Sequence, residues 1–189
     1  MGSDNIHHRK KQGGLTRKSR QVREYKNSIL IVCEGEKTEP NYFKSFPVSN
    51  IKVKAIGIGM STISLVAEAI KKWEAFLAEG FFFEHLWCVF DRDDFPQKVY
   101  NEAFEKIVHE ERKINKKLKR KEGMKLKIDI AYTNEAFELW YLLHYDYIDS
   151  ALDRSQYKGM LSTRMDKKYK KNDPKMYQFL QELSESTGV

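Results

Sequence analysis

The chain has 189 residues, 41% of them hydrophobic, which is enough for one sizeable core but too little for two full domains. Its 34 Lys and Arg residues exceed its 27 Asp and Glu residues, and the net charge of +7 favours polyanionic partners, nucleic acid before membrane. The densest apolar run, 81–90, is broken by Glu84 and His85, so we expect no membrane-spanning helix. The polar N-terminus lacks the apolar stretch of a secretory signal, so we expect a cytoplasmic protein.

The chain opens with a predicted basic arm, followed by a buried strand. Residues 9–26 are rich in Lys, Arg, Gln, Ser and Gly, which is typical of a flexible segment, and we expect a flexible basic arm over residues 1–26. Residues 28–33 form a β-branched apolar run without polar alternation, which indicates a strand covered on both faces in a parallel sheet. Pro40 suits the first turn of a helix that runs to about Phe46, with the pre-proline Glu39 near its N-cap.

Strands and helices then alternate along the chain. We expect further strands at residues 51–56, 85–90 and 126–131. We expect helices from a cap at Ser61 or Thr62 to Gly80, along the apolar stripe from Tyr100 to Leu118, and at 135–144. Residues 147–189 are predicted to form a basic, mostly helical C-terminal extension.

This alternation predicts an α/β fold with a mostly parallel central sheet and helices on both faces. In such folds the functional groups gather beyond the carboxyl ends of the strands. A glycine-rich phosphate loop is missing, because Gly57-Ile-Gly59 lacks the third glycine and the lysine of the known patterns. The two cysteines, Cys33 and Cys88, lie inside apolar strands and are expected to be buried structural thiols.

Carboxylates follow two of the predicted buried strands. Glu34 follows the first, and Asp91 and Asp93 follow the third, so all three should meet at one edge of the sheet. Crowded carboxylates repel, and a hard cation such as Mg²⁺ or Mn²⁺ relieves that repulsion. Asp91 and Asp93 are two residues apart, so they can share a metal while Arg92 points away. Asp94 either joins them or caps a turn.

The same residues have a simpler explanation, because carboxylates at strand ends and helix N-termini interact favourably with helix dipoles. For either acidic cluster alone that explanation would stand. Two clusters after two buried strands, in a chain that is otherwise basic, favour a metal site. Glu39 is placed to approach this site, whereas Glu36 is expected to be solvated.

Glu138 is unusual because it sits among apolar residues in the predicted helix 135–144. A lone buried carboxylate is costly and must find a metal, a cation or a proton. Glu138 therefore either completes a second metal position, with Asn134 one turn earlier on the same face, or forms an internal salt bridge. His144 is expected to be a helix-end or core histidine rather than a base.

Several basic residues are candidates for contacts with nucleic-acid phosphates. They are Lys37, Arg92, Lys116, Lys117, Lys119, Arg120, Lys167, Lys168, Lys170 and Lys171. The alternative for each run is a solvated helix face. Tyr157, Tyr169 and Tyr177 either stack on bases or belong to the core or its rim.

Three segments carry a resemblance to a known family. They are residues 29–43, with the block Glu-Gly-x-x-Thr-Glu-Pro, residues 89–94, with Val-Phe-Asp-Arg-Asp-Asp, and residues 134–144. Over about Arg23 to Tyr145 the chain resembles the RloB-like family, which is linked to restriction loci. The resemblance implies a Rossmann-like three-layer Toprim fold at 27–146, the fold shared by topoisomerases, primases and overcoming-lysogenization-defect nucleases.

The resemblance also implies roles for the residues that match the family pattern. Glu34 would be the Toprim glutamate, a general acid or base, and Asp91 and Asp93 would bind Mg²⁺. Glu39, Asp94, Asn134 and Glu138 match family positions that would assist them in catalysis or metal binding. It further implies a host-defence setting, other defence-system proteins as partners, and RNA such as transfer RNA as a target.

Within the Toprim superfamily, nuclease is the activity that suits this chain. A topoisomerase needs a tyrosine nucleophile on a large clamp, and a primase normally carries zinc-binding and helicase-contacting modules that 189 residues with two cysteines cannot supply. We therefore expect a metal-dependent nuclease that cuts RNA or DNA. The alternatives are a catalytically inactive nucleic-acid-binding or scaffold protein in a defence complex, and a nucleotidyl transferase.

Overall fold

The computed structural model describes residues 23–24, 28–46, 52–59, 62–92, 96–118 and 124–187. Its strands are β1 (Arg23–Glu24), β2 (Ser28–Cys33), β3 (Lys52–Gly57), β4 (Phe81–Phe82), β5 (His85–Asp91) and β6 (Lys127–Thr133). Its helices are α1 (Thr38–Lys44), α2 (Thr62–Ala78), α3 (Gln97–Leu118), α4 (Glu138–Leu142), α5 (Arg154–Arg164) and α6 (Met176–Thr187).

Four strands form the central sheet, in the order β3-β2-β5-β6, and every neighbouring pair is parallel. The predicted α/β fold with a parallel sheet is confirmed. The register places Cys33 beside both Gly57 and Val89, and Asp91 beside Thr133, so the carboxyl ends of the strands lie together. A separate small sheet pairs β1 with β4. Two residues of the predicted basic arm are thus in a strand, while 1–22 and 25–27 lie outside the described residues.

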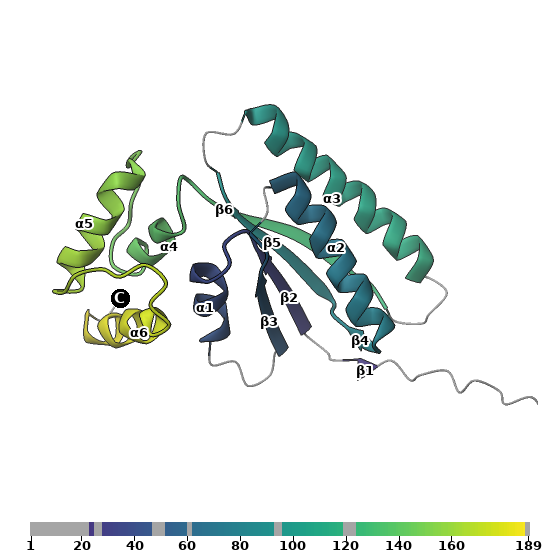
Figure 1. The fold of residues 1–189 in the computed structure, drawn as a ribbon, viewed down its shortest axis with the longest axis horizontal. Helices are drawn as coiled ribbons and strands as arrows, with labels where there is room; N and C mark the ends of the chain where they lie inside the picture. The colour runs from purple at the N-terminus through teal and green to yellow at the C-terminus, as the bar shows by residue number, and fades with distance from the viewer. Residues whose placement is uncertain are drawn as a thin grey trace, which may run out of the picture.

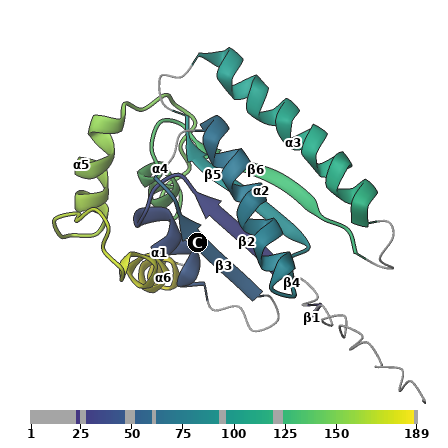
Figure 2. The same cartoon turned by 45° about the vertical axis from the view of Figure 1, so that its right-hand side comes forward.

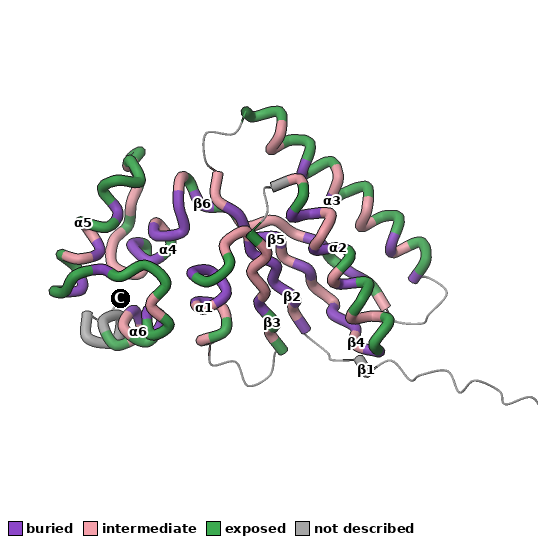
Figure 3. The backbone as a smooth tube through the Cα atoms, in the orientation of Figure 1, coloured by how far each residue is buried: buried purple, intermediate pink, exposed green. Residues whose placement is uncertain are grey.

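Helices cover both faces of the sheet, which gives the three layers visible in Figures 1 and 2. Because side chains alternate along a strand, Leu30 and Leu86 pack into one core with α2 and α3, and Ile31 and Val89 pack into another. Figure 3 shows the buried residues concentrated in the strands and on the inner sides of the helices. This arrangement confirms helices on both faces and agrees with a Rossmann-like three-layer fold.

The second core joins α1 to the C-terminal part of the chain. Tyr42 of α1 packs edge-on against Phe137 and Tyr177, with ring centroids 5.6 and 5.4 Å apart. Tyr157, Tyr169 and Tyr177 are 1%, 8% and 7% exposed and belong to this core. The core alternative for these three tyrosines is therefore confirmed, and they are not available to stack on bases.

Two helices begin elsewhere than predicted. α1 starts at Thr38 with Lys37 as its N-cap, so Glu39 lies inside the first turn and not at the cap. α4 covers only Glu138–Leu142, because tertiary hydrogen bonds hold the preceding residues in a turn. The hydroxyl of Tyr157 donates to the carbonyl oxygen of Asn134 at 2.9 Å. Asn134 is consequently not one helical turn before Glu138, and the prediction of a shared helix face is wrong.

Other local predictions agree with the structure. Gly80 follows the end of α2 with φ of 90°, a conformation that glycine adopts without strain. Cys33 and Cys88 are buried free thiols, and burial raises the pKa of Cys88 to about 12. Within the described part of the chain, no helix combines the length and the apolar character needed to cross a membrane.

Candidate active site

Glu34 and Asp91 lie side by side at the carboxyl ends of two neighbouring strands. Glu34 directly follows β2, and Asp91 is the last residue of β5. The backbone N–H of Glu34 donates to the carbonyl oxygen of Val89 at 2.8 Å, which extends the strand pairing by one residue. The N–H of Asp91 donates to Oε2 of Glu34 at 3.2 Å. The parallel sheet therefore brings together two carboxylates that are 57 positions apart in the sequence.

Thr133 fixes the carboxylate of Asp91 from the adjacent strand β6. It is buried and stands opposite Asp91 in the register, and its hydroxyl donates to Oδ1 of Asp91. The carbonyl oxygen of Thr133 accepts a hydrogen bond from the N–H of Arg92 at 2.7 Å. Asp91 is thus held in one orientation by side-chain and backbone contacts from two directions.

Glu39 is a buried carboxylate with an unsatisfied oxygen. It is 6% exposed, and its Oε2 has no hydrogen-bond partner among the described residues. Burial raises the pKa of Glu39 above its usual range, and repulsion by Asp91 and Glu138 adds to this, while its own backbone N–H and Lys171 act in the opposite direction. An unsatisfied buried carboxylate needs a proton or a cation. Glu39 is therefore suited to hold either one beside Asp91.

A polar cavity of about 440 Å³ connects these groups. It is lined by Glu34, Gly35, Glu36, Lys37, Thr38, Glu39, Asp91, Lys171 and Asn172. Two of these residues come from the loop between α5 and α6, and the hydroxyl of Thr38 donates to Oδ1 of Asn172 across 134 positions of sequence. The C-terminal part of the chain therefore supplies one wall of the cavity and places the ammonium group of Lys171 there.

Two glycines allow the chain to turn tightly around this cavity. A Cβ atom on Gly35 would overlap the carboxylate of Glu39, and one on Gly57 would overlap the carbonyl oxygen of Gly35. Any other residue at either position would move the backbone or the carboxylate.

Glu36 is exposed, as predicted.

Glu138 has the internal ion pair that was one of its two predicted alternatives. It is 5% exposed, accepts a hydrogen bond from the hydroxyl of Tyr169 at 3.2 Å, and lies 4.0 Å from Nζ of Lys171. It is not among the residues that line the carboxylate cavity. The described contacts make Glu138 a partner of Lys171, which itself reaches the cavity.

His144 is a structural histidine. Its Nε2 lies 2.7 Å from the hydroxyl of Tyr42, and burial lowers its pKa. This agrees with the predicted role at a helix end or in the core.

The predicted phosphate-contacting residues fall into separate groups. Lys37 and Lys171 line the cavity, and Lys167, Lys168 and Lys170 are exposed in the same α5–α6 loop as Lys171. The guanidinium of Arg92 donates to Oε1 of Gln97 at 2.6 Å and lies over the ring of Tyr100, so it points toward α3.

Lys116 and Lys117 are exposed in the last turn of α3, which runs back toward the amino ends of the strands. The last turn of α3 therefore lies near the amino ends of the strands (Figure 1), whereas Glu34 and Asp91 stand at their carboxyl ends. Lys119 and Arg120 lie outside the described residues.

The metal prediction rests on residues of which only some are described. Asp93 and Asp94 lie outside the described residues, and among the side chains that are described no group of three or more His, Cys, Asp or Glu could hold a metal ion. The donors that are present, Glu34, Asp91 and the unsatisfied oxygen of Glu39, are all carboxylate oxygens. That donor chemistry fits Mg²⁺ or Mn²⁺.

Sequence reasoning missed several residues of the site, among them Thr133, Gly35 and Asn172. Thr133 is the last residue of β6, so the rule that placed Glu34 and Asp91 at the carboxyl ends of the strands also applied to it. Gly35 stands inside the Glu-Gly-x-x-Thr-Glu-Pro block, where its missing side chain leaves room for Glu39. Asn172 has a positive φ of 64° in an irregular loop, and no pattern in the sequence indicates its contact with Thr38.

A family model described as RloB-like protein matches residues 29–186, from β2 into α6. The match extends well beyond Tyr145, where the resemblance was expected to end. No curated protein and no solved structure gives a significant match to the chain.

Proposed function

The chain belongs to the RloB-like family, and from that premise we propose that it is a Toprim-type, metal-dependent nuclease that hydrolyses phosphodiester bonds of RNA or DNA. The observation that carries the proposal is the buried, unsatisfied Oε2 of Glu39 beside Asp91, in a cavity at the carboxyl edge of a parallel sheet. A buried carboxylate of this kind is expected where a cation completes the site.

Each residue of the cavity has a role in this proposal. Asp91 and Glu34, together with Asp93 and Asp94, would hold Mg²⁺ or Mn²⁺, and Glu39 would contribute its unsatisfied oxygen. When bound, the metal supplies charge stabilisation at the scissile phosphate and lowers the pKa of a coordinated water. Glu34 moves a proton between water and substrate as general acid or base. Lys37 and Lys171 contact the phosphate backbone from two sides of the cavity.

The biological setting is also part of the proposal. Its support is the match to the RloB-like family, for which the sequence resemblance implies a link to restriction loci, and the basic composition of the chain, with a net charge of +7. We place the protein in a cytoplasmic anti-phage or restriction-linked system, with transfer RNA as the first substrate to examine and other defence-system proteins as partners.

Cleavage of labelled polymers tests this function. We expect wild-type protein with Mg²⁺ or Mn²⁺ to cut transfer RNA, single-stranded DNA or duplex DNA, and EDTA to stop the reaction. Glu34→Gln and Asp91→Ala should abolish cleavage, whereas the matched exposed variants Glu105→Gln and Asp149→Ala should retain it. A wild-type protein that binds metal and nucleic acid yet cuts none of the three would refute the nuclease.

A second candidate is an inactive nucleic-acid-binding or scaffold protein, and one observation favours it. The described carboxylates do not form a group of three or more that could hold a metal ion. This candidate predicts nucleic-acid binding that neither metal nor Asp91→Ala changes. A nucleotidyl transferase would instead lengthen the labelled polymer when nucleoside triphosphates are added to the reaction, with release of pyrophosphate.

A further inference from the structure

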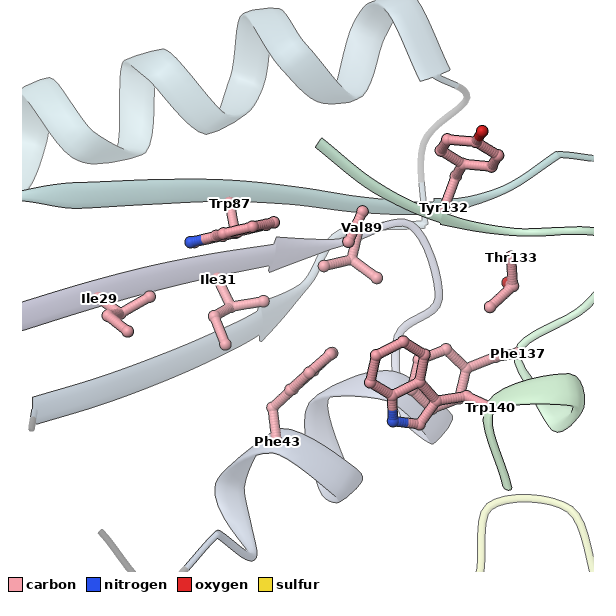
Figure 4. A pocket seen from close by; sticks show the side chains of 10 residues that line it. Ile29, Ile31, Phe43, Trp87, Val89, Tyr132, Thr133, Phe137 and Trp140 are labelled. Atoms are coloured by element: carbon pink, nitrogen blue, oxygen red, sulfur yellow. The ribbon is translucent and has the colours of Figure 1, made fainter. Parts of the chain in front are cut away.

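A second, apolar pocket of about 280 Å³ opens on the α1 face of the central sheet (Figure 4). Strands β2, β5 and β6 form its floor, and side chains from α1 and the α4 region form its opposite wall. Its lining residues are Ile29, Ile31, Phe43, Trp87, Val89, Ala131, Tyr132, Thr133, Phe137 and Trp140. Apart from Tyr132, four of them are aromatic, namely Phe43, Trp87, Phe137 and Trp140, which is a larger share than the 13% of the whole chain.

One aromatic ring of this pocket remains open to a ligand. Trp140 is 39% exposed, although it is a large hydrophobic residue. The ring of Tyr132 points to the other face of the sheet (Figure 4), where it packs edge-on against Tyr100 of α3 with ring centroids 5.0 Å apart, so it offers no stacking surface to the pocket. The rings of Phe137 and Trp140 are nearly parallel, at 16°, and their centroids are 6.5 Å apart. Figure 4 shows these two rings facing the sheet residues Ile31 and Val89 across the pocket. Flat rings that line an accessible hollow are suited to hold another flat ring by stacking.

This pocket adjoins the carboxylate cavity through a single residue. Thr133 lines the apolar pocket, and its hydroxyl donates to Asp91, which lines the carboxylate cavity. The two hollows therefore lie on either side of the hydrogen bond between Thr133 and Asp91, at the carboxyl ends of β5 and β6. A ligand with a charged group at Asp91 and a flat apolar group next to it would occupy both.

We propose that the apolar pocket binds one unpaired nucleobase of the nucleic acid whose phosphate lies at the carboxylate cavity. The inference rests on the proposed function and specifies its substrate class. A volume of about 280 Å³ lies at the small end of ligand pockets, so it suits a single base. Stacking on aromatic rings with few polar groups tolerates any base, so the pocket selects for an accessible base and not for a sequence.

The geometry restricts which nucleic acids fit. A base inside a duplex is paired and stacked, so it reaches the pocket only if it is flipped out of the helix. A base in a single strand, a loop or a bulge is already accessible. The preferred substrates are consequently single-stranded or looped regions, with an intact duplex bound more weakly.

A second copy of the chain is the rival occupant. A stable interface between two copies buries about 800 Å² on each, as a broad surface. The pocket is a small hollow next to a charged cavity, a shape that suits a group projecting from a polymer. The experiment below includes the oligomeric state, so it separates these two occupants.

Binding without metal tests the inference separately from cleavage. The probe is a short fluorescein-labelled single-stranded DNA, titrated in EDTA into wild type, Trp140→Ala and Phe104→Ala. Phe104 is a matched control because it is also 39% exposed but lies on α3, outside the pocket. We expect Trp140→Ala to raise the Kd about tenfold or more, and Phe104→Ala to change it by less than about twofold.

Two further measurements secure the assignment against a folding defect. Trp140→Phe keeps a ring at this position and should retain binding within about threefold of wild type. A blunt duplex of the same sequence should bind wild type more weakly than the single strand and should not distinguish Trp140→Ala from Phe104→Ala.

Three results would overturn the inference. The first is that Trp140→Ala and Phe104→Ala bind the single strand with equal affinity. The second is that wild type binds single strand and duplex equally well. The third is that sedimentation shows a dimer of wild type that Trp140→Ala loses, while the affinity for the single strand is unchanged. Because all binding is measured in EDTA, a protein that binds as expected but never cuts with Mg²⁺ refutes the nuclease alone. A protein that cuts but fails these binding tests refutes the base pocket alone.

Discussion

The carboxylate of Glu39 lies in the space that a Cβ atom on Gly35 would occupy. The helix α1 can therefore bring Glu39 to the cavity only because residue 35 has no side chain. We expect Gly35→Ala to displace the carboxylate, to destabilise the protein by about 1–3 kcal/mol, and to slow metal-dependent cleavage about a hundredfold. Urea unfolding and cleavage rates measure the two effects.

Gly159→Ala is the matched control for that substitution. Gly159 lies inside α5, and a Cβ there would meet nothing within 4 Å. Alanine should stabilise this helix by about 1 kcal/mol and leave cleavage unchanged. If Gly35→Ala left stability and cleavage as little impaired as Gly159→Ala, the close approach of Glu39 to Gly35 would not be needed for activity.

The buried carboxylate of Glu39 should make stability depend on pH and metal. Its pKa is raised in the folded protein, so the unfolded chain ionises at lower pH than the folded one. In EDTA, wild-type stability should therefore fall, relative to Glu39→Gln, as pH rises from the ordinary glutamate pKa through the raised one. Mg²⁺ or Mn²⁺ should stabilise wild type, by about 2.7 kcal/mol when its concentration is a hundred times the Kd. Wild type should then be more stable than Glu39→Gln, which is the reverse of the order in EDTA.

Thermal unfolding of both proteins across pH, with and without metal, measures this. Glu102→Gln, an exposed glutamate on α3, serves as the control and should follow wild type under all conditions. Identical pH profiles for wild type and Glu39→Gln would mean that the carboxylate of Glu39 is not perturbed by its burial.

Lys171 should matter more for activity than for stability. Its side chain is 59% exposed, so its 4.0 Å ion pair with Glu138 contributes about 1 kcal/mol or less. Its ammonium group lines the carboxylate cavity, where a phosphate would lie. We expect Lys171→Met to lower kcat/KM about tenfold while the unfolding free energy changes by about 1 kcal/mol or less.

Lys158→Met, an exposed change on α5, controls for the loss of one positive charge and should lower kcat/KM by less than about twofold. Adding Glu138→Gln to Lys171→Met should restore stability without restoring activity. Equal kinetic effects at positions 158 and 171 would show that only net charge matters.

Thr133 should be required for the orientation of Asp91. Thr133→Val keeps the shape of the side chain but removes the hydroxyl that donates to Asp91. We expect a stability loss of about 1 kcal/mol and a fall in metal affinity or cleavage of about 10- to 100-fold. Isothermal titration with Mn²⁺ and cleavage rates measure these effects.

The same substitution at Thr163, whose hydroxyl donates to Gly159 in exposed helix α5, should leave both metal affinity and cleavage unchanged. Unchanged metal affinity and cleavage in Thr133→Val would remove this residue from the site.

The sheet and the meeting of Glu34 with Asp91 could be predicted because both follow from local patterns. Continuous apolar runs indicate buried parallel strands, and their carboxyl ends must share one edge. The start of α4 could not be predicted in this way. Asn134 and Glu135 continue the apparent helical pattern, but the contact of Asn134 with Tyr157, 23 positions later, holds them in a turn.

Lys171, whose ammonium group lies at the cavity, was predicted only as a member of a basic run. Nothing in the pattern of 167–171 distinguishes Lys171 from its neighbours, because its position depends on the fold of the α5–α6 loop and on the bond between Thr38 and Asn172. The aromatic pocket was not foreseen for a similar reason. Phe43, Trp87 and Trp140 come from three separate elements, and only the folded chain brings them together.

The wall formed by Lys171 and Asn172 has a consequence for how the protein can be divided and recombined. A fragment cut at residue 146 would keep Glu34, Glu39 and Asp91 but would lose this wall, together with Tyr177 and the other C-terminal residues of the core under α1. The carboxylates therefore come from the first 146 residues, whereas one wall of the cavity comes from the C-terminal third. In chimaeras between family members, exchanging only the C-terminal third should alter substrate preference while the metal requirement stays with the N-terminal parent.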